Sequence, residues 1–225
     1  MCTFNKTTQT QEIKNLWKIK ATNSNSIIEL RAIKKQAGQE AEIITKLFKG
    51  QNFQSVDELR LAFEQEALNL NAQGYNIYIV MNPIKAEFTG GSAGDKDIDY
   101  RDLLLIDIDR HETNNPATEL ELEAAKLLTD KIIDYLSNGG WDDPIKVMSG
   151  NGYHLYCLLD NVANSEDNKF AIKHFLNELA VEFDNDIVKV DTCVYNASRI
   201  TKVVGTIARK GEETAERPYR MARFL

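Results

Sequence analysis

The sequence has little of several features that mark particular protein classes. It contains three cysteines in 225 residues, Cys2, Cys157 and Cys193, which form no Cys-x-x-Cys pair and therefore predict reduced thiols and no zinc site. No apolar run reaches the roughly 18 residues of a membrane-spanning helix, and residues 1–20 lack the apolar core of a secretion signal. With 4 prolines and 12 glycines, the chain is neither collagen-like nor of low complexity. We therefore expect a globular cytoplasmic protein without a membrane partner.

Negative charge is in excess, but it is unevenly distributed. The net charge of the chain is −7. Residues 199–225 carry seven Lys or Arg and three Glu, a net charge of +4, which leaves −11 for residues 1–198. The acidic body argues against a protein that coats nucleic acid non-specifically. The basic end indicates either a protein that holds polyanions in one place and metal ions in another, or a solvated tail.

The second half of the chain predicts one supersecondary unit. Strands are expected at residues 103–108, 145–148, 153–159 and 187–192, and amphipathic helices at 118–136 and 165–183. This β-α-β-β-α-β order is that of the ferredoxin-like or RNA-recognition-motif (RRM) unit, an antiparallel sheet whose first and third strands are neighbours.

The first half gives fewer signals. A capping box at residues 55–58 begins a helix that Gly74 ends, and 75–81 is expected to be a strand. Residues 26–35 and 42–48 fit strands or short helices.

The predicted topology gathers acidic side chains at one edge of this sheet. Asp107 and Asp109 alternate along the first strand, so both carboxylates share one face. Asp191 lies on the fourth strand, which is next to the first. Oxygen-only ligands favour Mg²⁺ or Mn²⁺, and three carboxylates can hold two such ions. The alternatives to a metal site are that the first strand simply ends in solvent at Asp107 and Asp109, and that Asp191 faces solvent.

A glycine-rich turn joins the second and third strands. Ser149, Gly150 and Asn151 open it, and its glycines permit backbone N–H groups to form an anion-binding nest. An ordinary Asn-Gly hairpin turn explains the same residues. His154 follows the turn, and we interpret it as a hydrogen-bond donor to a phosphate oxygen rather than a metal ligand.

Cations follow the third carboxylate. Arg199 offers bidentate phosphate geometry and Lys202 a point charge, unless they form a solvated basic edge. Five further cations suit a nucleic-acid backbone: Arg209, Lys210, Arg217, Arg220 and Arg223.

Taken in order, these motifs resemble the archaeo-eukaryotic primase superfamily, in particular its phage and plasmid primase-polymerase branch. The resemblance covers residues 75 to 220. It rests on the segments YIVMNP at 78–83, LIDID at 105–109, SGNGYH at 149–154, VDT at 190–192 and YNASR at 195–199.

The resemblance implies a fold and a set of roles. The fold would be α+β, with an N-terminal α/β lobe of about residues 1–101 packed on an RRM-like catalytic lobe of about 102–225. Asp107, Asp109 and Asp191 would bind two Mg²⁺ or Mn²⁺ ions. The residues expected to contact the nucleotide are Ser149, Gly150, Asn151, His154, Arg199, Lys202 and Asn82.

The resemblance also implies a function, which is template-directed nucleotidyl transfer by a DNA primase or primase-polymerase. Its partners would be single-stranded DNA template, primer and nucleoside triphosphates, in a bacterial, phage or plasmid setting. Tyr195 or Tyr219 would stack on template bases. A helicase or helical primase domain, common in replication members, would be a further partner. Two alternatives remain: a non-catalytic single-stranded nucleic-acid-binding module with an RRM-like fold, and a two-metal nuclease.

Overall fold

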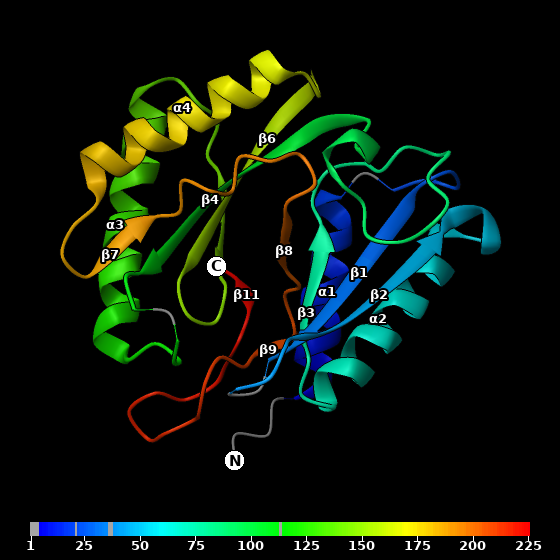
Figure 1. Ribbon diagram of the computed structural model, residues 1–225, viewed down its shortest axis with the longest axis horizontal. Coiled ribbons are helices and arrows are strands. Elements are labelled where there is room, and N and C mark those ends of the chain that lie inside the picture. Colours follow the sequence, from blue (N-terminus) through cyan, green and yellow to red (C-terminus); the bar gives the residue numbers. More distant parts are fainter. Residues whose placement is uncertain (1–4, 21, 36–37, 113) are drawn as a thin grey trace.

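Two antiparallel sheets face each other, with helices on their outer sides (Figure 1). The structure is a computed structural model that describes residues 5–20, 22–35, 38–112 and 114–225. One continuous hydrophobic core runs through both layers, and it includes Leu30 and Phe63 from the first lobe and Ile106 and Leu176 from the second.

The first sheet has four strands in the order β2-β1-β3-β8. Their bounds are Glu42–Lys49 for β2, Ile27–Lys34 for β1, Asn76–Val80 for β3 and Ile200–Lys202 for β8. Helices α1 (Lys6–Ile19) and α2 (Val56–Ala72) cover its outer face (Figure 1). The Ser55 side chain caps α2 by accepting the N–H of Glu58, as the sequence predicted. Because Trp17 of α1 packs against Phe63 of α2, the two helices form one layer.

The second sheet has five strands in the order β11-β5-β6-β4-β7. Their bounds are Arg223–Phe224 for β11, Ile145–Met148 for β5, Tyr153–Ala163 for β6, Tyr100–Arg110 for β4 and Val188–Val190 for β7. Helices α3 (Glu119–Asn138) and α4 (Glu166–Phe183) cover its outer face. The order β4-α3-β5-β6-α4-β7 is the predicted β-α-β-β-α-β unit, and β6 and β7 flank β4 as predicted.

The alternation of residues along β4 decides what each face of the second sheet does. Ile106 and Ile108 are fully buried, whereas Asp107 and Asp109 lie on the other face and line a cavity together with residues of the first sheet. Since successive side chains of a strand point to opposite faces, the same strand that anchors the core also presents two carboxylates.

One strand of the second lobe joins the sheet of the first lobe. β4 begins at Tyr100, beside the division expected near residue 101, but β8 pairs with β3 of the first sheet. The chain then forms the short pair β9 (Ile207–Ala208) and β10 (Arg220–Met221) before β11 returns to the second sheet. The basic C-terminal segment therefore runs between both layers.

Several segments that the sequence left open are now assigned. The polar opening contains α1, and residues 26–35 and 42–48 contain the strands β1 and β2. Short 3₁₀ helices occupy Gly50–Asn52 and Asp95–Asp97. Cys157 and Cys193 are free thiols, and Cys2 lies outside the described residues. In the described part of the chain, no helix is both long and apolar enough to cross a membrane.

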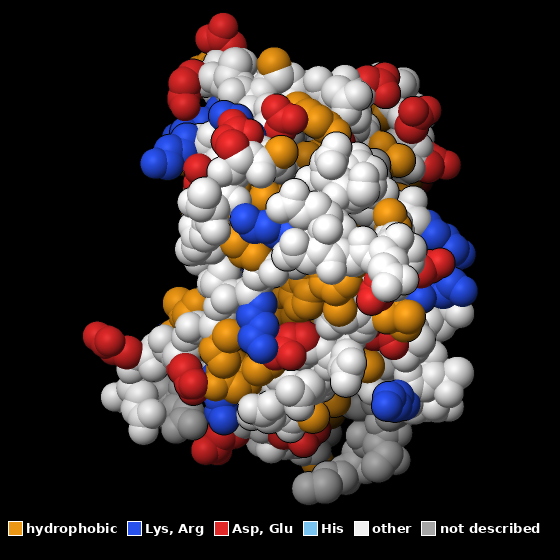
Figure 2. Space-filling view, turned by 90° about the vertical axis from the view of Figure 1, so that its right-hand side faces the viewer, with side chains coloured by type: hydrophobic (Ala, Val, Ile, Leu, Met, Phe, Trp, Pro, Cys, Tyr) orange, Lys and Arg blue, Asp and Glu red, His pale blue; other side chains and the backbone are white. Residues whose placement is uncertain are grey.

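Charges of both signs are interspersed on the outer surface of the first lobe. Figure 2 shows this side, where Lys and Arg side chains are scattered among acidic and hydrophobic ones instead of forming one basic patch. Ion pairs explain part of this pattern, because Lys46 lies 2.6 Å from Glu66 and Arg60 lies 2.9 Å from Glu64.

Candidate active site

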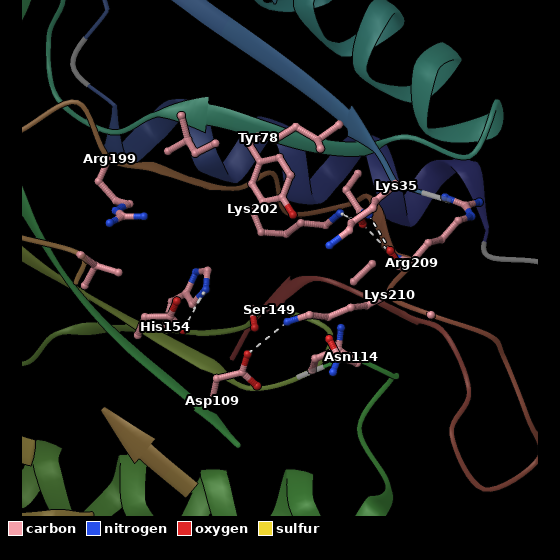
Figure 3. A pocket seen from close by; sticks show the side chains of 18 of the residues that line it. Lys35, Tyr78, Asp109, Asn114, Ser149, His154, Arg199, Lys202, Arg209 and Lys210 are labelled. Atoms are coloured by element: carbon pink, nitrogen blue, oxygen red, sulfur yellow. Dashed lines mark hydrogen bonds and ion pairs between the residues drawn. The ribbon is translucent and has the colours of Figure 1, made fainter. Parts of the chain in front are cut away.

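A cavity of about 690 Å³ is lined by residues of both sheets and of the segment after β8. Its walls carry opposite charges (Figure 3). Asp109 of β4 lies on one side, and Lys202 of β8 and Arg209 lie across from it. Asp107, on the same strand and face as Asp109, also lines the cavity. The other polar lining residues are Lys35, Asn76, Tyr78, Asn114, Ser149, Asn151, His154, Arg199 and Lys210.

Strand register builds the acidic wall. Asp107 is paired with His154 of β6, so their side chains lie on one face, and His154 Nε2 is 3.5 Å from Asp107 Oδ1. Asp191 follows β7, and its backbone N–H donates to the carbonyl of Asp107 at 2.8 Å. The structure thus places Asp107, His154 and Asp191 on neighbouring strands at one edge, but Asp191 is not among the residues that line the cavity. The Asp191 side chain accepts the N–H of Cys193 at 2.8 Å.

The acidic wall holds negative charge that is poorly balanced. Burial, followed by the charges of Asp109 and Asp191, raises the pKa of Asp107 to about 8. A carboxyl group that resists ionisation because it is buried next to like charges is stabilised in its ionised form by a cation. The all-oxygen donor set suits Mg²⁺ or Mn²⁺. With the side chains as they stand, no group of three or more His, Cys, Asp or Glu among the described residues is gathered closely enough to hold an ion.

Side-chain cations contact Asp109. Lys210 Nζ is 3.6 Å from Asp109 Oδ2, and Arg110 Nη1 is 3.7 Å from Oδ1. Arg110 is almost fully buried and also donates to the carbonyl of Asn151. Asp109 is therefore less isolated than Asp107, and the two carboxylates of the Asp-x-Asp motif differ in environment.

The opposite wall holds positive charge without an acidic partner among the described residues. Lys202 is 4% exposed and donates to Asn76 Oδ1 at 3.0 Å and to the carbonyl of Ile207 at 3.1 Å. Burial and the charge of Arg209 lower the pKa of Lys202 well below its usual value. The buried Nη1 of Arg209 has no hydrogen-bond partner in the described chain. A bound anion would relieve both deficits.

Asn76 organises this basic wall, although the sequence gave it no role. Its Oδ1 accepts from Lys202 Nζ and from the backbone N–H of Arg209 at 2.8 Å, and its Nδ2 donates to the carbonyl of Arg209. Tyr78 lies on the same strand, with Lys202 Nζ 5.4 Å from its ring centroid. Both residues alternate with apolar neighbours along β3, which is the one sequence signal that pointed to this face.

His154 is neutral at physiological pH. Burial and the nearby Lys202 lower its pKa to about 4. It can therefore donate a hydrogen bond to a phosphate, as the sequence suggested, but it adds no positive charge. Arg199 also lines the cavity, and its Nη2 donates to the carbonyl of Cys193.

The glycine turn has a packing role that the sequence did not predict. A Cβ on Gly150 would lie 2.4 Å from the Cβ of Ala208, and one on Gly152 would lie 2.2 Å from the carbonyl oxygen of Ile108. The N–H of Gly150 points to the sulfur of Met148, and that of Ser149 to the carbonyl of Gly152.

These contacts give the turn little capacity as an anion nest, because two of its amides are occupied. Asn151 Oδ1 accepts the N–H of Ala117, so this side chain fastens the turn to the segment before α3. Ser149 and Asn151 line the cavity, whereas Gly150 is not among the lining residues.

Asn82, expected in the nucleotide pocket, is not a lining residue. It is 2% exposed and accepts the N–H groups of Asp102 and Leu103 at 3.1 Å each, while its Nδ2 donates to the carbonyl of Ala197. Its polar atoms are therefore used in joining the end of β3 to the start of β4.

The basic C-terminal segment divides into two groups. Arg209 and Lys210 line the cavity. Arg217 instead pairs with Glu121 at 2.8 Å, and Arg220 with Glu119 at 2.5 Å, which clamps the segment to the first turn of α3. Arg223 lies on β11 and is exposed.

The two aromatic residues proposed to stack on bases also have partners. The hydroxyl of Tyr219 donates to the carbonyl of Gly211, and Lys173 lies over the ring of Tyr195.

Comparison with known proteins identifies the fold. No protein-family model matches the sequence, and no curated protein does. Among solved structures, primase RepB′ matches with a TM-score of 0.54 and 14% identity, covering 96% of this chain and 56% of that one. This chain therefore spans little more than half of that primase.

Two further structures contain DNA. The catalytic domain of primase RepB′ in complex with initiator DNA matches with a TM-score of 0.53 and 13% identity, over 96% of this chain and 84% of that one. The polymerase domain of Mycobacterium tuberculosis ligase D in complex with DNA matches with a TM-score of 0.54 and 15% identity, over 96% and 81%. The chain thus has the α+β fold of these primase and polymerase domains, which confirms the fold predicted from sequence.

Proposed function

We propose that this protein is a template-directed nucleotidyltransferase that makes or extends primers on single-stranded DNA. The observation that carries the proposal is that the two walls of the cavity each have charged groups without sufficient partners. Asp107 lies on one wall, and Lys202 and Arg209 lie on the other. A nucleoside triphosphate with its divalent ions brings complementary charges to both. The cavity volume lies in the range of small-molecule sites, about 300–1,000 Å³. The shared fold with a primase and a DNA polymerase domain supports the same class.

The residues of each wall would have separate tasks. Asp107, Asp109 and Asp191 would hold Mg²⁺ or Mn²⁺, which when bound lowers the pKa of an attacking hydroxyl and stabilises charge on the transferred phosphoryl group. Lys202 and Arg209 would hold the phosphates.

The remaining cavity donors would orient the nucleotide. His154 would donate one hydrogen bond through a neutral N–H, and Arg199 would bind the outer end of the triphosphate. Positioning and charge stabilisation are the main contributions that a protein makes to phosphoryl transfer.

The test is synthesis on single-stranded DNA, with and without a labelled primer, with each nucleotide set in turn and with Mg²⁺ or Mn²⁺. We expect longer products from the wild type and at least a 100-fold loss of rate for Asp107→Asn, because charge stabilisation of this kind contributes about 10²–10³. Asp160→Asn is the matched control, since Asp160 is an exposed acid on β6 outside the cavity. It should retain wild-type synthesis.

Product length separates the alternatives. Shortened DNA would indicate a nuclease, and DNA binding without any change of length would indicate a non-catalytic module. Either result, or normal synthesis by Asp107→Asn, would refute the proposal.

A further inference from the structure

Three buried side chains form a hydrogen-bonded row behind the cavity. Tyr156 Oη lies 2.8 Å from Thr201 Oγ1, which lies 3.0 Å from His154 Nδ1. At the far side of the imidazole, Nε2 is 3.5 Å from Asp107 Oδ1. Tyr156, Thr201 and His154 are 2%, 4% and 6% exposed, so water does not readily replace any member.

The chemistry of the row gives it a direction. Thr201 Oγ1 is the single hydrogen-bond partner of the Tyr156 hydroxyl among the described residues. If the phenol donates to Thr201, the threonine hydroxyl is free to donate to His154 Nδ1, and the ring proton must then lie on Nε2. Both hydroxyl donors of the row are then used, and the remaining N–H faces the Asp107 carboxyl group.

The reverse direction is unfavourable at the tyrosine end, and it is also unfavourable at the Asp107 end once that carboxyl group is ionised, above its pKa of about 8. A proton on Nδ1 would donate to Thr201, Thr201 would donate to Tyr156, and the buried phenolic O–H would lack an acceptor in the described chain. An unpaired buried donor costs about 1–3 kcal/mol. At the other end, the lone pair of Nε2 would face the oxygen of Asp107.

We infer that Thr201 and Tyr156 are positioning residues that fix the neutral imidazole of His154 as the Nε2–H tautomer, with this N–H directed at the anionic substrate. The tautomer of a histidine is set by the hydrogen bond that its other nitrogen makes. The statement that the N–H points at substrate rests on the proposed function. The assignment of the ring proton to Nε2 rests on the hydrogen bonds alone.

The row also joins the two lobes. His154 and Tyr156 belong to β6 of the second sheet, whereas Thr201 belongs to β8 of the first. The residue that determines the tautomer therefore comes from the opposite lobe. The proton of His154 is therefore held on Nε2 only when the two sheets are in contact.

The first test is the proton position in the wild type. In protein labelled with ¹⁵N-histidine at pH 8, the two nitrogens of His154 should give one protonated and one unprotonated resonance, with the proton on Nε2. A His154→Gln sample assigns the signals against His111 and His174. A proton on Nδ1, or equal population of both tautomers, would overturn the inference whatever the activity.

Variants then test the positioning residues. Thr201→Val keeps the shape but removes the hydroxyl, so both tautomers should become populated and the nucleotide KM should rise about fivefold, the effect of one hydrogen bond. Thr201→Ser should restore the wild-type signals. Tyr156→Phe should act in the same direction but more weakly, since Thr201 keeps its hydroxyl.

Thr129→Val is the matched control, because Thr129 is a buried threonine whose hydroxyl donates to the carbonyl of Ala125 in α3. It should leave the imidazole signals and KM unchanged. Unchanged signals in Thr201→Val would overturn the inference. If the wild type shows the Nε2–H signature but makes no DNA, the proposed function fails and the tautomer assignment stands.

Discussion

Asp107, Lys202 and Arg209 inside the cavity lack the close ionised partners of opposite charge that arginines outside it have. Outside, Arg217 and Arg220 are paired with glutamates of α3. Inside, the pKa of Asp107 is raised by burial and by like charges, and Lys202 is held by hydrogen bonds alone. Burying an unbalanced charge destabilises a folded chain. Under the proposed function, this contrast separates residues that bind a ligand from residues that stabilise the fold, and it predicts different effects on stability when each is neutralised.

The largest expected effect follows from removing the cation of the basic wall. If the proposed function is right, Lys202→Met should lower kcat/KM for nucleotide by about 100-fold, because it removes a cationic group next to the proposed triphosphate site. It should change the melting temperature little, since removing a buried charge that has no acidic partner offsets the loss of its hydrogen bonds to Asn76 and Ile207. Steady-state kinetics measures kcat/KM, and thermal melting measures the stability. Lys46→Met is the control, and retained activity in Lys202→Met would contradict the assignment.

A smaller effect of opposite sign is expected at Asp107 in the absence of divalent ions. The folded-state pKa of about 8 lies above the ordinary value of 3.8, so the folded protein holds this proton more tightly than the unfolded chain. Stability therefore falls as pH rises from about 4 to 8.

Asp107→Asn should remove this loss. We expect a gain of about 1–2 kcal/mol at pH 8, below the full value of the shift because the side chain is 25% exposed. The gain should disappear near pH 4. Melting in chelator over this pH range measures it, and adding Mg²⁺ or Mn²⁺ should stabilise the wild type but not the variant. A variant less stable than the wild type at pH 8 would contradict the expectation.

The smallest effect is expected for the clamp outside the cavity. Arg217→Gln removes two contacts with Glu121 and one with the carbonyl of Pro116. A partly exposed ion pair contributes up to about 1 kcal/mol, so the melting temperature should fall by about 2–4 °C. Nucleotide KM and DNA affinity should not change. A weaker DNA affinity would restore the role that the sequence gave to this arginine.

The parts of the fold that the sequence predicted depend on local signals. The β4–β7 unit was predicted because apolar periodicity, capping residues and a glycine turn each act over a few residues. The convergence of Asp107, His154 and Asp191 followed from that topology. The polar segment of α1 lacked a decisive local pattern, and so did β1 and β2.

The rest of the site depends on pairings between distant residues. Lys202 contacts Asn76 across 126 positions, and Arg217 contacts Glu121 across 96. A count of charges cannot tell which arginine is already neutralised, so the sequence grouped Arg209 with Arg217. Asn82 was misplaced for a similar reason, because a polar residue beside a motif can equally satisfy buried backbone groups.

The crossing of β8 into the first sheet has a consequence for fragments of this protein. β8 forms the border of that sheet beside β3. A piece that ends near residue 101 would leave the backbone N–H and C=O groups along that side of β3 without partners, and such unprotected strands promote aggregation. Neither half should then be prepared alone in soluble, well-ordered form, and both should unfold in one cooperative step.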